Sequence, residues 1–241
     1  MTYLSIIIPA HNEEKRLPET LHAIDTFVRA QSYTVEVLVV ENGSVDATAQ
    51  VVRAHGAKHK HVRLLHEPDR GKGLAVRRGM LAAQGEFRFM CDADLSMPIE
   101  QIARFLPPQL TDCDVAIGSR EVAGAVRFHE PAFTHVRGRM FSNLVKLLAL
   151  PDFEDTQCGF KCFGAQAALD LFSTQRLDGM SFDVEVLYIA RKRGYRIVEV
   201  PVDWYFHRET RVRMLRDSFG MFFDILALRR NWRDGKYAGP R

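Results

Sequence analysis

The first half of the chain alternates short continuous apolar runs with longer stretches of helical periodicity. Apolar runs rich in β-branched residues indicate buried strands, whereas apolar residues that recur every three or four positions indicate amphipathic helices. The runs predict strands at 4–8, 35–40, 62–65, 87–90 and 114–118. The periodic stretches predict helices at 17–30, 46–54, 72–81 and from 98 onward. Because strands and helices alternate, we expect an α/β fold with a parallel sheet.

The second half of the chain is less regular. Residues 121–139 have no period and are basic, so we expect a lid or binding loop, since long irregular stretches are uncommon inside compact domains. Residues 140–150 are apolar on most faces, which fits either a core helix or a helix pressed against lipid. Further elements are predicted as a short strand within 155–163, helices at 165–172 and 182–193, a last strand at 197–204 and a helix at 214–232.

Length and charge favour one domain with a basic end. The 241 residues are 46% hydrophobic, which suits a single large α/β domain over residues 1–241. The net charge of +3 is too small to indicate nucleic-acid binding. Residues 205–241 hold nine Lys/Arg against four Asp/Glu, so we expect a basic amphipathic extension there. Such an extension suits an anionic surface, lipid or phosphate, and equally a solvated helix face.

The sequence predicts a cytoplasmic protein. Its four cysteines form no Cys-x-x-Cys pair, which favours ordinary buried thiols in a reducing compartment. We expect no signal peptide, because the apolar run 4–9 is short and charge follows it at once. No apolar run approaches the roughly 18 residues that a membrane span needs. The protein is therefore expected to be soluble or to rest on a membrane surface.

The fourth predicted strand ends in two carboxylates, Asp92 and Asp94, separated by one residue. Ligands bind beyond the carboxyl ends of strands in open parallel sheets, so both acids are expected at the mouth of a site. Two such acids can share one Mg²⁺, which completes its shell with water and phosphate oxygens. The pair is therefore a candidate diphosphate anchor, although Asp-x-Asp taken alone is more often a solvated turn.

Acceptor-rich side chains follow the first two strands. The sequence has no Gly-x-Gly-x-x-Gly after the first strand and no Walker loop, which disfavours a dehydrogenase or a P-loop enzyme. The first turn instead offers Asn12, Glu13 and Glu14, and the second offers Glu41 and Asn42. These acceptors suit a base edge and a ribose diol, and they are equally common as turn or cap residues.

Cations that could hold phosphate occur in several loops. Gly71 and Gly73 flank Lys72 at a predicted helix start, where backbone amides can approach an anion. Guanidinium groups match phosphate oxygens in two-point geometry. The arginines placed for this role are Arg120, Arg137, Arg139, Arg208 and Arg211. Any single one of them is more often a solvated surface residue.

Three histidines lie in one loop stretch bounded by lysines. They are His55, His59 and His61. Because no further ligand is near them in the sequence, we do not predict a metal site there.

Seven motifs together resemble those of family 2 glycosyltransferases. They are IIIPAHNEE, VVENGSVDAT, RGKG, CDADLS, IGSR, DTQCGFK and FDVEVLYIA. The resemblance runs from Leu4 to about Arg230 and is strongest to the polyprenyl-phosphate sugar transferases, above all the dolichyl-phosphate β-glucosyltransferases. It implies a GT-A fold and a metal-dependent hexosyltransferase. The implied reaction is an inverting transfer of glucose from UDP-glucose to a polyprenyl or dolichyl phosphate at the cytoplasmic membrane face.

The resemblance also implies roles for individual residues. The nucleotide sugar would contact Pro9, Asn12, Glu14, Glu41, Lys72, Asp92 and Arg211. Asp92 and Asp94 would hold Mg²⁺ or Mn²⁺ against the diphosphate. Arg120 and Arg139 would bind the acceptor phosphate. Asp155 would lie close to the reaction centre and count with Asp92, Asp94 and Arg120 as catalytic.

The chain departs from the family pattern in places. Glu41-Asn42 stands where two aspartates usually precede Gly-Ser, and Ser96 stands where mannosyl transferases of this group carry a glutamine metal ligand. We expect no N-terminal membrane anchor of the eukaryotic kind, so membrane contact would rest on 140–150, 214–232 and the basic extension. Asp183 either orients sugar hydroxyls or caps its helix. The alternatives are a transferase of the same fold that uses GDP-mannose or a non-lipid acceptor, and a non-catalytic nucleotide-sugar-binding scaffold.

Overall fold

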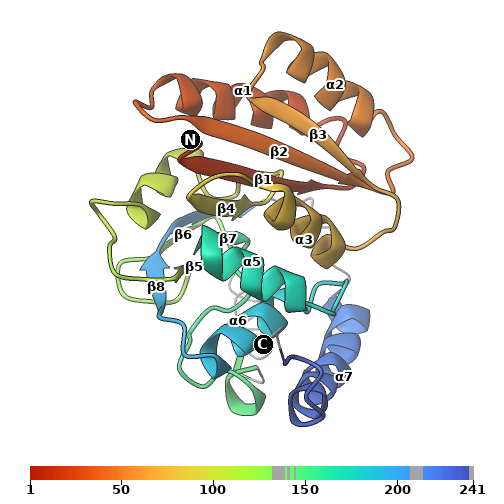
Figure 1. The fold of residues 1–241 in the computed structure, drawn as a ribbon, viewed down its shortest axis with the longest axis vertical. Helices are drawn as coiled ribbons and strands as arrows, with labels where there is room; N and C mark the ends of the chain where they lie inside the picture. The colour runs from red at the N-terminus through yellow and green to blue at the C-terminus, as the bar shows by residue number, and fades with distance from the viewer. Residues whose placement is uncertain (132–138, 140–141, 144, 207–213, 239–241) are drawn as a thin grey trace.

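A seven-stranded sheet forms the centre of the computed structural model (Figure 1). The structure describes residues 1–131, 139, 142–143, 145–206 and 214–238, without the side chains of 214–219 and 221. The strands are β1 Leu4–Ala10, β2 Val35–Asn42, β3 Val62–Glu67, β4 Phe87–Cys91, β5 Val115–Ser119, β7 Phe160–Gly164 and β8 Ile197–Pro201. They lie in the order β3-β2-β1-β4-β7-β5-β8.

The sheet is mostly parallel, as predicted, and β7 is the exception. It pairs antiparallel with β4 and with β5, whereas β1 to β4 pair in parallel and β8 pairs in parallel with β5. Parallel neighbours need a crossover that returns the chain to the opposite edge of the sheet. The antiparallel direction of β7 means that it starts at the edge where β5 ends. Residues 155–159, which lead into β7, therefore lie at the edge where the parallel strands end.

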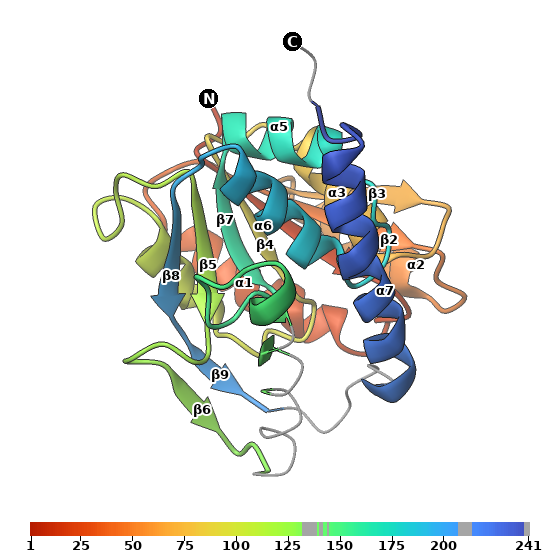
Figure 2. The ribbon, with the colours of Figure 1, turned by 90° about the horizontal axis from the view of Figure 1, so that it is seen from below.

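Helices cover both faces of the sheet (Figures 1 and 2). They are α1 Leu17–Arg29, α2 Thr48–Lys58, α3 Lys72–Ala82, the 3₁₀ helix η1 Ile99–Phe105, α5 Ala165–Thr174, α6 Phe182–Lys192 and α7 Met214–Arg233. The core on one face joins α1, α2 and η1 to the sheet, and the core on the other joins α3, α5, α6 and α7. The helix predicted from residue 98 is thus a short 3₁₀ helix.

The predicted strand 197–204 is interrupted. Val202 is fully buried between β8 and the short strand β9 Asp203–Tyr205. β9 leaves the main sheet and pairs in parallel with β6 Val126–Phe128, where the rings of Phe128 and Tyr205 stack 4.5 Å apart. The expectation of an irregular loop over 121–139 is therefore wrong at 126–128, and residues 132–138 lie outside the described part.

Two predicted helices with wide apolar faces pack on the domain and also expose apolar side chains. Val145 is fully buried, which supports a core position for the described part of 140–150, while Leu147 is 82% exposed. On α7, Ile225 and Leu228 are buried in the core shared with α6, and Phe223 is 64% exposed. Among the described residues, no helix combines the length and the apolar character needed to cross a membrane.

The expectations for the thiols and for the extension have different outcomes. All four cysteines are free, and three of them are buried, as predicted for ordinary thiols. The extension expected over 205–241 begins at the last residue of β9, so its first residue belongs to the second sheet.

Candidate active site

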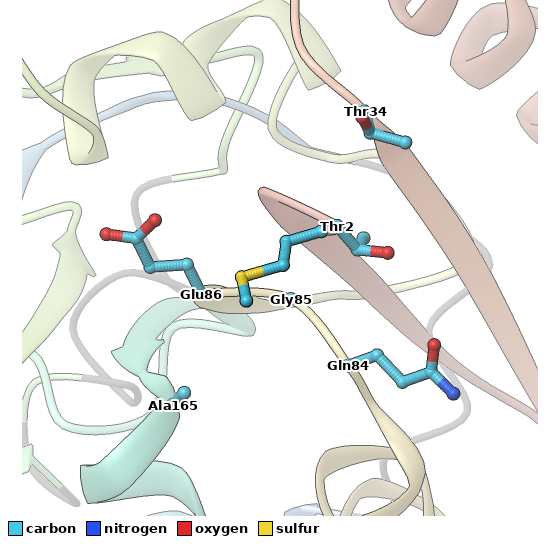
Figure 3. Close-up of a pocket in the computed structure, with 7 residues that line it drawn as sticks. Thr2, Thr34, Gln84, Gly85, Glu86 and Ala165 are labelled. Carbon is cyan, nitrogen blue, oxygen red and sulfur yellow. The ribbon is translucent and has the colours of Figure 1, made fainter.

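The predicted motifs meet at one edge of the sheet. The loops after β1, β2, β3, β4 and β5 all leave the carboxyl ends of strands that share one direction, and residues 155–159 reach the same edge. This is the edge at which open parallel sheets bind their ligands. A surface hollow at the opposite edge lies where β1, β2 and β4 begin (Figure 3). Its described lining residues include none of the predicted site residues.

The loops after β1 and β2 are braced against each other. The Val45 amide donates to Asn12 Oδ1 at 2.8 Å, and the Ala47 amide donates to Glu14 Oε2 at 2.9 Å. The Asn12 amide donates to Ser44 Oγ at 3.0 Å. Asn12 has a φ of 55°, a left-handed conformation that asparagine tolerates better than most residues. Asn12 and Glu14 thus fix the shape of this wall, and their nucleoside contacts stay a prediction.

Glu41 is almost fully buried in the same wall. Its Oε1 accepts a hydrogen bond from the Ser44 amide at 2.5 Å, and its Oε2 lies 2.6 Å from His66 Nδ1. Burial acts to raise the pKa of Glu41, but the Ser44 amide and His66 outweigh it and hold the pKa below its usual value. The neighbouring Pro9 is half-buried on β1, paired with Val40. Glu41 is therefore an ionised, anchored part of the wall.

β4 delivers the two predicted acids to the edge. Lys72, the first residue of α3, places its Nζ 2.6 Å from Asp92 Oδ1. Asp94 Oδ1 accepts a hydrogen bond from the Ser96 amide at 3.0 Å. Leu95 between them has a φ of 45°, a conformation that costs a non-glycine residue about 1–3 kcal/mol and that is concentrated at functional sites. The turn that directly follows Asp94 is thus held in an unfavourable conformation.

Lys72 enters the site because the start of α3 packs closely on residues 177–178. A Cβ at Gly71 would lie 2.4 Å from the Asp178 carbonyl oxygen, and one at Gly73 would lie 2.5 Å from that of Leu177. The two glycines therefore have a packing role in this structure. Burial acts to lower the pKa of Lys72, yet the surrounding carboxylates raise it to about 12, so Lys72 is a permanent cation.

The Asp92 carboxylate lies directly against the backbone of Gly159. A Cβ at that position would be 2.0 Å from Asp92 Oδ2. Glycine is therefore required at position 159 for Asp92 to hold its present place. Gly159 belongs to the DTQCGFK motif and was not predicted as a site residue.

A buried ion pair lies close to the acids. Lys161 on β7 and Asp183 on α6 are 1% and 3% exposed, and their Nζ and Oδ1 atoms are 2.6 Å apart. Burial raises the pKa of Asp183, the charge of Asp92 adds to the rise, and Lys161 and Lys72 oppose it. The carboxylate of Asp183 is thus engaged by a lysine of the sheet, which does not fit the alternative of a helix cap. Lys161 was not predicted.

β5 delivers Arg120 to Asp155. Arg120 Nε lies 2.6 Å from Asp155 Oδ2 and Nη2 lies 3.0 Å from Oδ1, and the Arg120 amide donates to Oδ2 at 3.1 Å. The Asp155 side chain is 5% exposed. Burial acts to raise its pKa, but the charge and hydrogen bonds of Arg120 lower that pKa to about 2. Arg120 is therefore held in two-point geometry by a permanently ionised partner.

Two further side chains support this pair and were not predicted. Glu199 on β8 accepts hydrogen bonds from the amides of Glu154 at 2.9 Å and Asp155 at 3.0 Å, which fixes the loop that carries Asp155. Trp204 on β9 contacts two guanidinium groups, those of Arg120 and Arg127, each 5.5 Å from its ring centroid. Such cation–π contacts orient both arginines.

The other predicted arginines have different outcomes. Arg139 Nη1 lies 2.9 Å from Oε2 of Glu121, the residue that follows Arg120 in the chain. The side chain of Arg139 is 41% exposed. It is therefore near the loop that carries Arg120. Arg137, Arg208 and Arg211 lie outside the described residues.

The site thus has an acidic pole and a cationic pole that one short segment connects. Asp92 and Asp94 form the acidic pole, and Arg120 forms the centre of the other. The segment 155–159 begins with the partner of Arg120 and ends with the glycine that Asp92 packs against. The acidic pole can hold a cation, and the opposite pole can hold an anion.

Comparison with known proteins points to one family. The model of glycosyl transferase family 2 matches residues 5–169. The chain is 38% identical over 216 residues to dolichyl-phosphate beta-glucosyltransferase of Drosophila melanogaster, covering 83% of this chain and 66% of that protein. It is 34% identical over 214 residues to a dolichyl-phosphate beta-glucosyltransferase of Trichomonas vaginalis, covering 84% of this chain and 64% of the relative. The chain thus spans about two thirds of the length of these relatives.

Solved structures with the same fold are glycosyltransferases of low sequence identity. Mannosyl-3-phosphoglycerate synthase from Rubrobacter xylanophilus has a TM-score of 0.69 and 19% identity, covering 98% of this chain and 75% of that one. Glucosyl-3-phosphoglycerate synthase from Mycobacterium tuberculosis, solved with Mn²⁺ and UDP-glucose, has a TM-score of 0.64 and 18% identity, covering 100% and 80%. These similarities confirm the predicted GT-A fold.

Proposed function

The chain belongs to glycosyl transferase family 2, and on that premise we propose that it transfers glucose from UDP-glucose to a polyprenyl or dolichyl phosphate with inversion at the anomeric carbon. The observation that carries the proposal is the pairing of the two poles through residues 155–159. A departing nucleotide diphosphate and an incoming lipid phosphate are both anions. The acidic pole suits the diphosphate through a bound cation, and the cationic pole suits the lipid phosphate directly. We take glucose as the transferred sugar and dolichyl phosphate as the acceptor because the relatives are dolichyl-phosphate beta-glucosyltransferases.

The acidic pole fits Mg²⁺ or Mn²⁺. Carboxylate oxygens at a strand end are ligands that these hard cations prefer, and Asp92 already faces the ammonium group of Lys72. Asp94 uses one oxygen for the Ser96 amide, and we assign the metal to the other. When bound, the metal neutralises the charge that develops on the departing diphosphate. The solved Mn²⁺ and UDP-glucose complex of the Mycobacterium tuberculosis enzyme supports the use of a divalent metal.

The residues of the chain have separate tasks in the transfer. Lys72 stands beside the acids at the start of α3, where its charge meets the diphosphate. The acceptor phosphate is already ionised near neutral pH, so it can attack the anomeric carbon without a strong base. Asp155 occupies Nε and Nη2 of Arg120, so we assign Nη1 to the acceptor phosphate. Arg139 supplies a second cation from the adjacent segment.

We assign the nucleoside to the braced wall formed by the loops after β1 and β2. Asn12, Glu14 and Glu41 hold that wall in one conformation, and Pro9 lies at its base. A preformed wall lowers the ordering cost of ligand binding. The proposed contact of Arg211 with the diphosphate completes the donor site.

We further propose that the protein acts peripherally at the cytoplasmic face of a membrane. Leu147 and Phe223 are 82% and 64% exposed, and Leu226 beside Phe223 on α7 is 43% exposed. Residues 205–241 add the basic excess described above. Exposed apolar side chains together with basic charge favour binding to anionic lipid surfaces.

The activity is tested by incubating purified protein with UDP-glucose, Mg²⁺ and a polyprenyl phosphate in lipid vesicles. We expect a glucolipid whose formation stops on chelation, is faster on anionic than on neutral vesicles, and falls strongly when GDP-mannose replaces UDP-glucose. A product only with GDP-mannose, or only with a soluble phosphate acceptor, would favour the alternative transferases. Nucleotide stabilisation in thermal-shift measurements without any transfer would favour a scaffold.

Substitution of Gly159 should impair the reaction more than it impairs the fold. In Gly159→Ala the new methyl group must displace the Asp92 carboxylate, so we expect kcat to fall by about 10- to 100-fold. The melting temperature should change by no more than a few degrees, because the displaced group is a half-exposed side chain. Gly179→Ala is the matched control, since nothing lies within 4 Å of a Cβ there. Equal rates for the two variants would contradict the proposed place of Asp92.

A further inference from the structure

Four metal-binding side chains gather at the edge of the sheet opposite the active site. Asp25 on α1 is 1% exposed and is approached by three imidazoles. His55 Nε2 lies 2.8 Å and His59 Nδ1 lies 3.1 Å from Asp25 Oδ2, and His61 Nε2 lies 2.8 Å from Oδ1. We predicted no metal site here because no further ligand is near these histidines in the sequence. The packing of α1 on α2 nevertheless brings Asp25 to all three of them.

One buried carboxylate is shared by all three imidazoles. His61 Nε2 forms a hydrogen bond with Asp25 Oδ1, whereas His55 Nε2 and His59 Nδ1 both contact Oδ2. The rings of His55 and His59 also stack, with centroids 4.2 Å apart and planes inclined by 12°. Two imidazoles thus converge on one carboxylate oxygen.

The spacing of the donor atoms suits a tetrahedral ion. One ligand atom from each of Asp25, His59 and His61 lies within 4.8 Å of the other two. Zn²⁺ bonds of about 2.0–2.2 Å to nitrogen and oxygen place ligand atoms roughly 3.3 Å apart, so small side-chain rotations would close the set on an ion. His55 and His59 are four positions apart at the end of α2, the separation at which two histidines on a helix face share one zinc.

We propose that Asp25, His59 and His61 bind Zn²⁺, with His55 as the fourth donor. Three imidazoles and one carboxylate form a borderline donor set that suits zinc better than Mg²⁺, which prefers oxygen ligands. Four protein donors leave no open position, which is the arrangement of a structural site. The ion would tie α1 to the connection between α2 and β3, far from the strand ends that carry the transferase residues.

The test is zinc binding by the full chain without a polyhistidine tag. After incubation with Zn²⁺ and dialysis against excess Mg²⁺, which keeps Asp92 and Asp94 occupied, elemental analysis should find about one zinc per chain. The double variant His59→Ala/His61→Ala should retain less than about a tenth of that amount. His22→Ala, which removes an exposed histidine from the same helix as Asp25, should bind like the wild type.

A second measurement separates lost zinc binding from lost folding. Zn²⁺ should raise the melting temperature of the wild type and of His22→Ala by about 5 °C or more, and should leave that of the milder variant His61→Asn unchanged. Far-ultraviolet circular dichroism shows whether each variant is folded. Equal zinc retention in the wild type and the double variant would overturn the proposal. Zinc that is lost in Asp94→Asn and kept in His61→Asn would also overturn it.

Discussion

Replacing Asp94 with asparagine should lower kcat by about 10²- to 10³-fold and leave the fold intact. The side chain is half-exposed at the end of β4, and Asn Oδ1 can still accept the hydrogen bond from the Ser96 amide. Only the negative charge is lost, and that charge is proposed to hold the metal against the diphosphate. Initial rates at saturating UDP-glucose measure the effect, and titration with Mg²⁺ should show a raised metal requirement.

Asp112→Asn provides the matched control for this charge removal. Asp112 is 84% exposed on its side chain, pairs with Arg196 at 3.4 Å and has a φ of 60°, which asparagine tolerates. It lies in the connection that leads into the start of β5, at the opposite edge from the site. The control should keep the wild-type rate and metal requirement. A wild-type rate in Asp94→Asn itself would mean that the metal has been assigned to the wrong carboxylate.

The elements that carry the site could be predicted because each has a strong local signal. Runs such as 35–40 are buried on both faces of a parallel sheet and so contain hardly any polar residue, and this marks them in the sequence. The direction of β7 has no such signal, because it depends on the edge of the sheet at which the long connection after β5 ends. The break at Val202 was missed for a related reason. Apolar residues at 198, 200, 202 and 204 continue one strand-like alternation across the break, and the partner of β9 is a strand of only three residues.

The site residues divide in the same way, into those with a local signal in the sequence and those that only tertiary packing brings together. Asp92, Asp94 and Arg120 follow strands, so their common edge could be predicted from strand direction alone. Lys161 resembles any surface lysine until α6 brings Asp183 to it, 22 positions further along the chain. Asp25 lies 36 positions before His61. Ion pairs and metal clusters of this kind depend on tertiary packing, and neither periodicity nor spacing encodes it.

Substitution of Asp155 should destabilise the fold strongly. Asp155→Asn leaves the guanidinium of Arg120, only 24% exposed, without its counter-charge, and we expect the free energy of unfolding to fall by about 3 kcal/mol. The folded-state pKa of about 2 lies below the ordinary value of 3.8, so the carboxylate stabilises the fold fully above about pH 4 and loses this contribution as the pH falls toward 2. The deficit of the variant, measured by urea unfolding, should therefore shrink between pH 4 and pH 2.

Asp152→Asn serves as the control for that unfolding series. Its ion pair with Arg191, at 2.5 Å, is solvent-exposed, since the side chain of Asp152 is 58% exposed and that of Arg191 is 35% exposed. Loss of this pair should lower the free energy of unfolding by no more than about 0.5 kcal/mol at any of these pH values. An equal cost for the two variants would contradict a buried, charge-dependent role for Asp155.

The double variant Arg120→Gln/Asp155→Asn separates the structural role of this pair from the proposed catalytic one. Removing both charges together leaves no unpaired ion, so most of the lost unfolding free energy should return. Transfer of glucose should stay about 10²-fold or more below the wild-type rate, because the cation proposed to bind the acceptor phosphate is absent. If Arg120 only supported the fold, recovery of stability would bring recovery of the rate. A stable and active double variant would therefore move the acceptor phosphate to another arginine, such as Arg139.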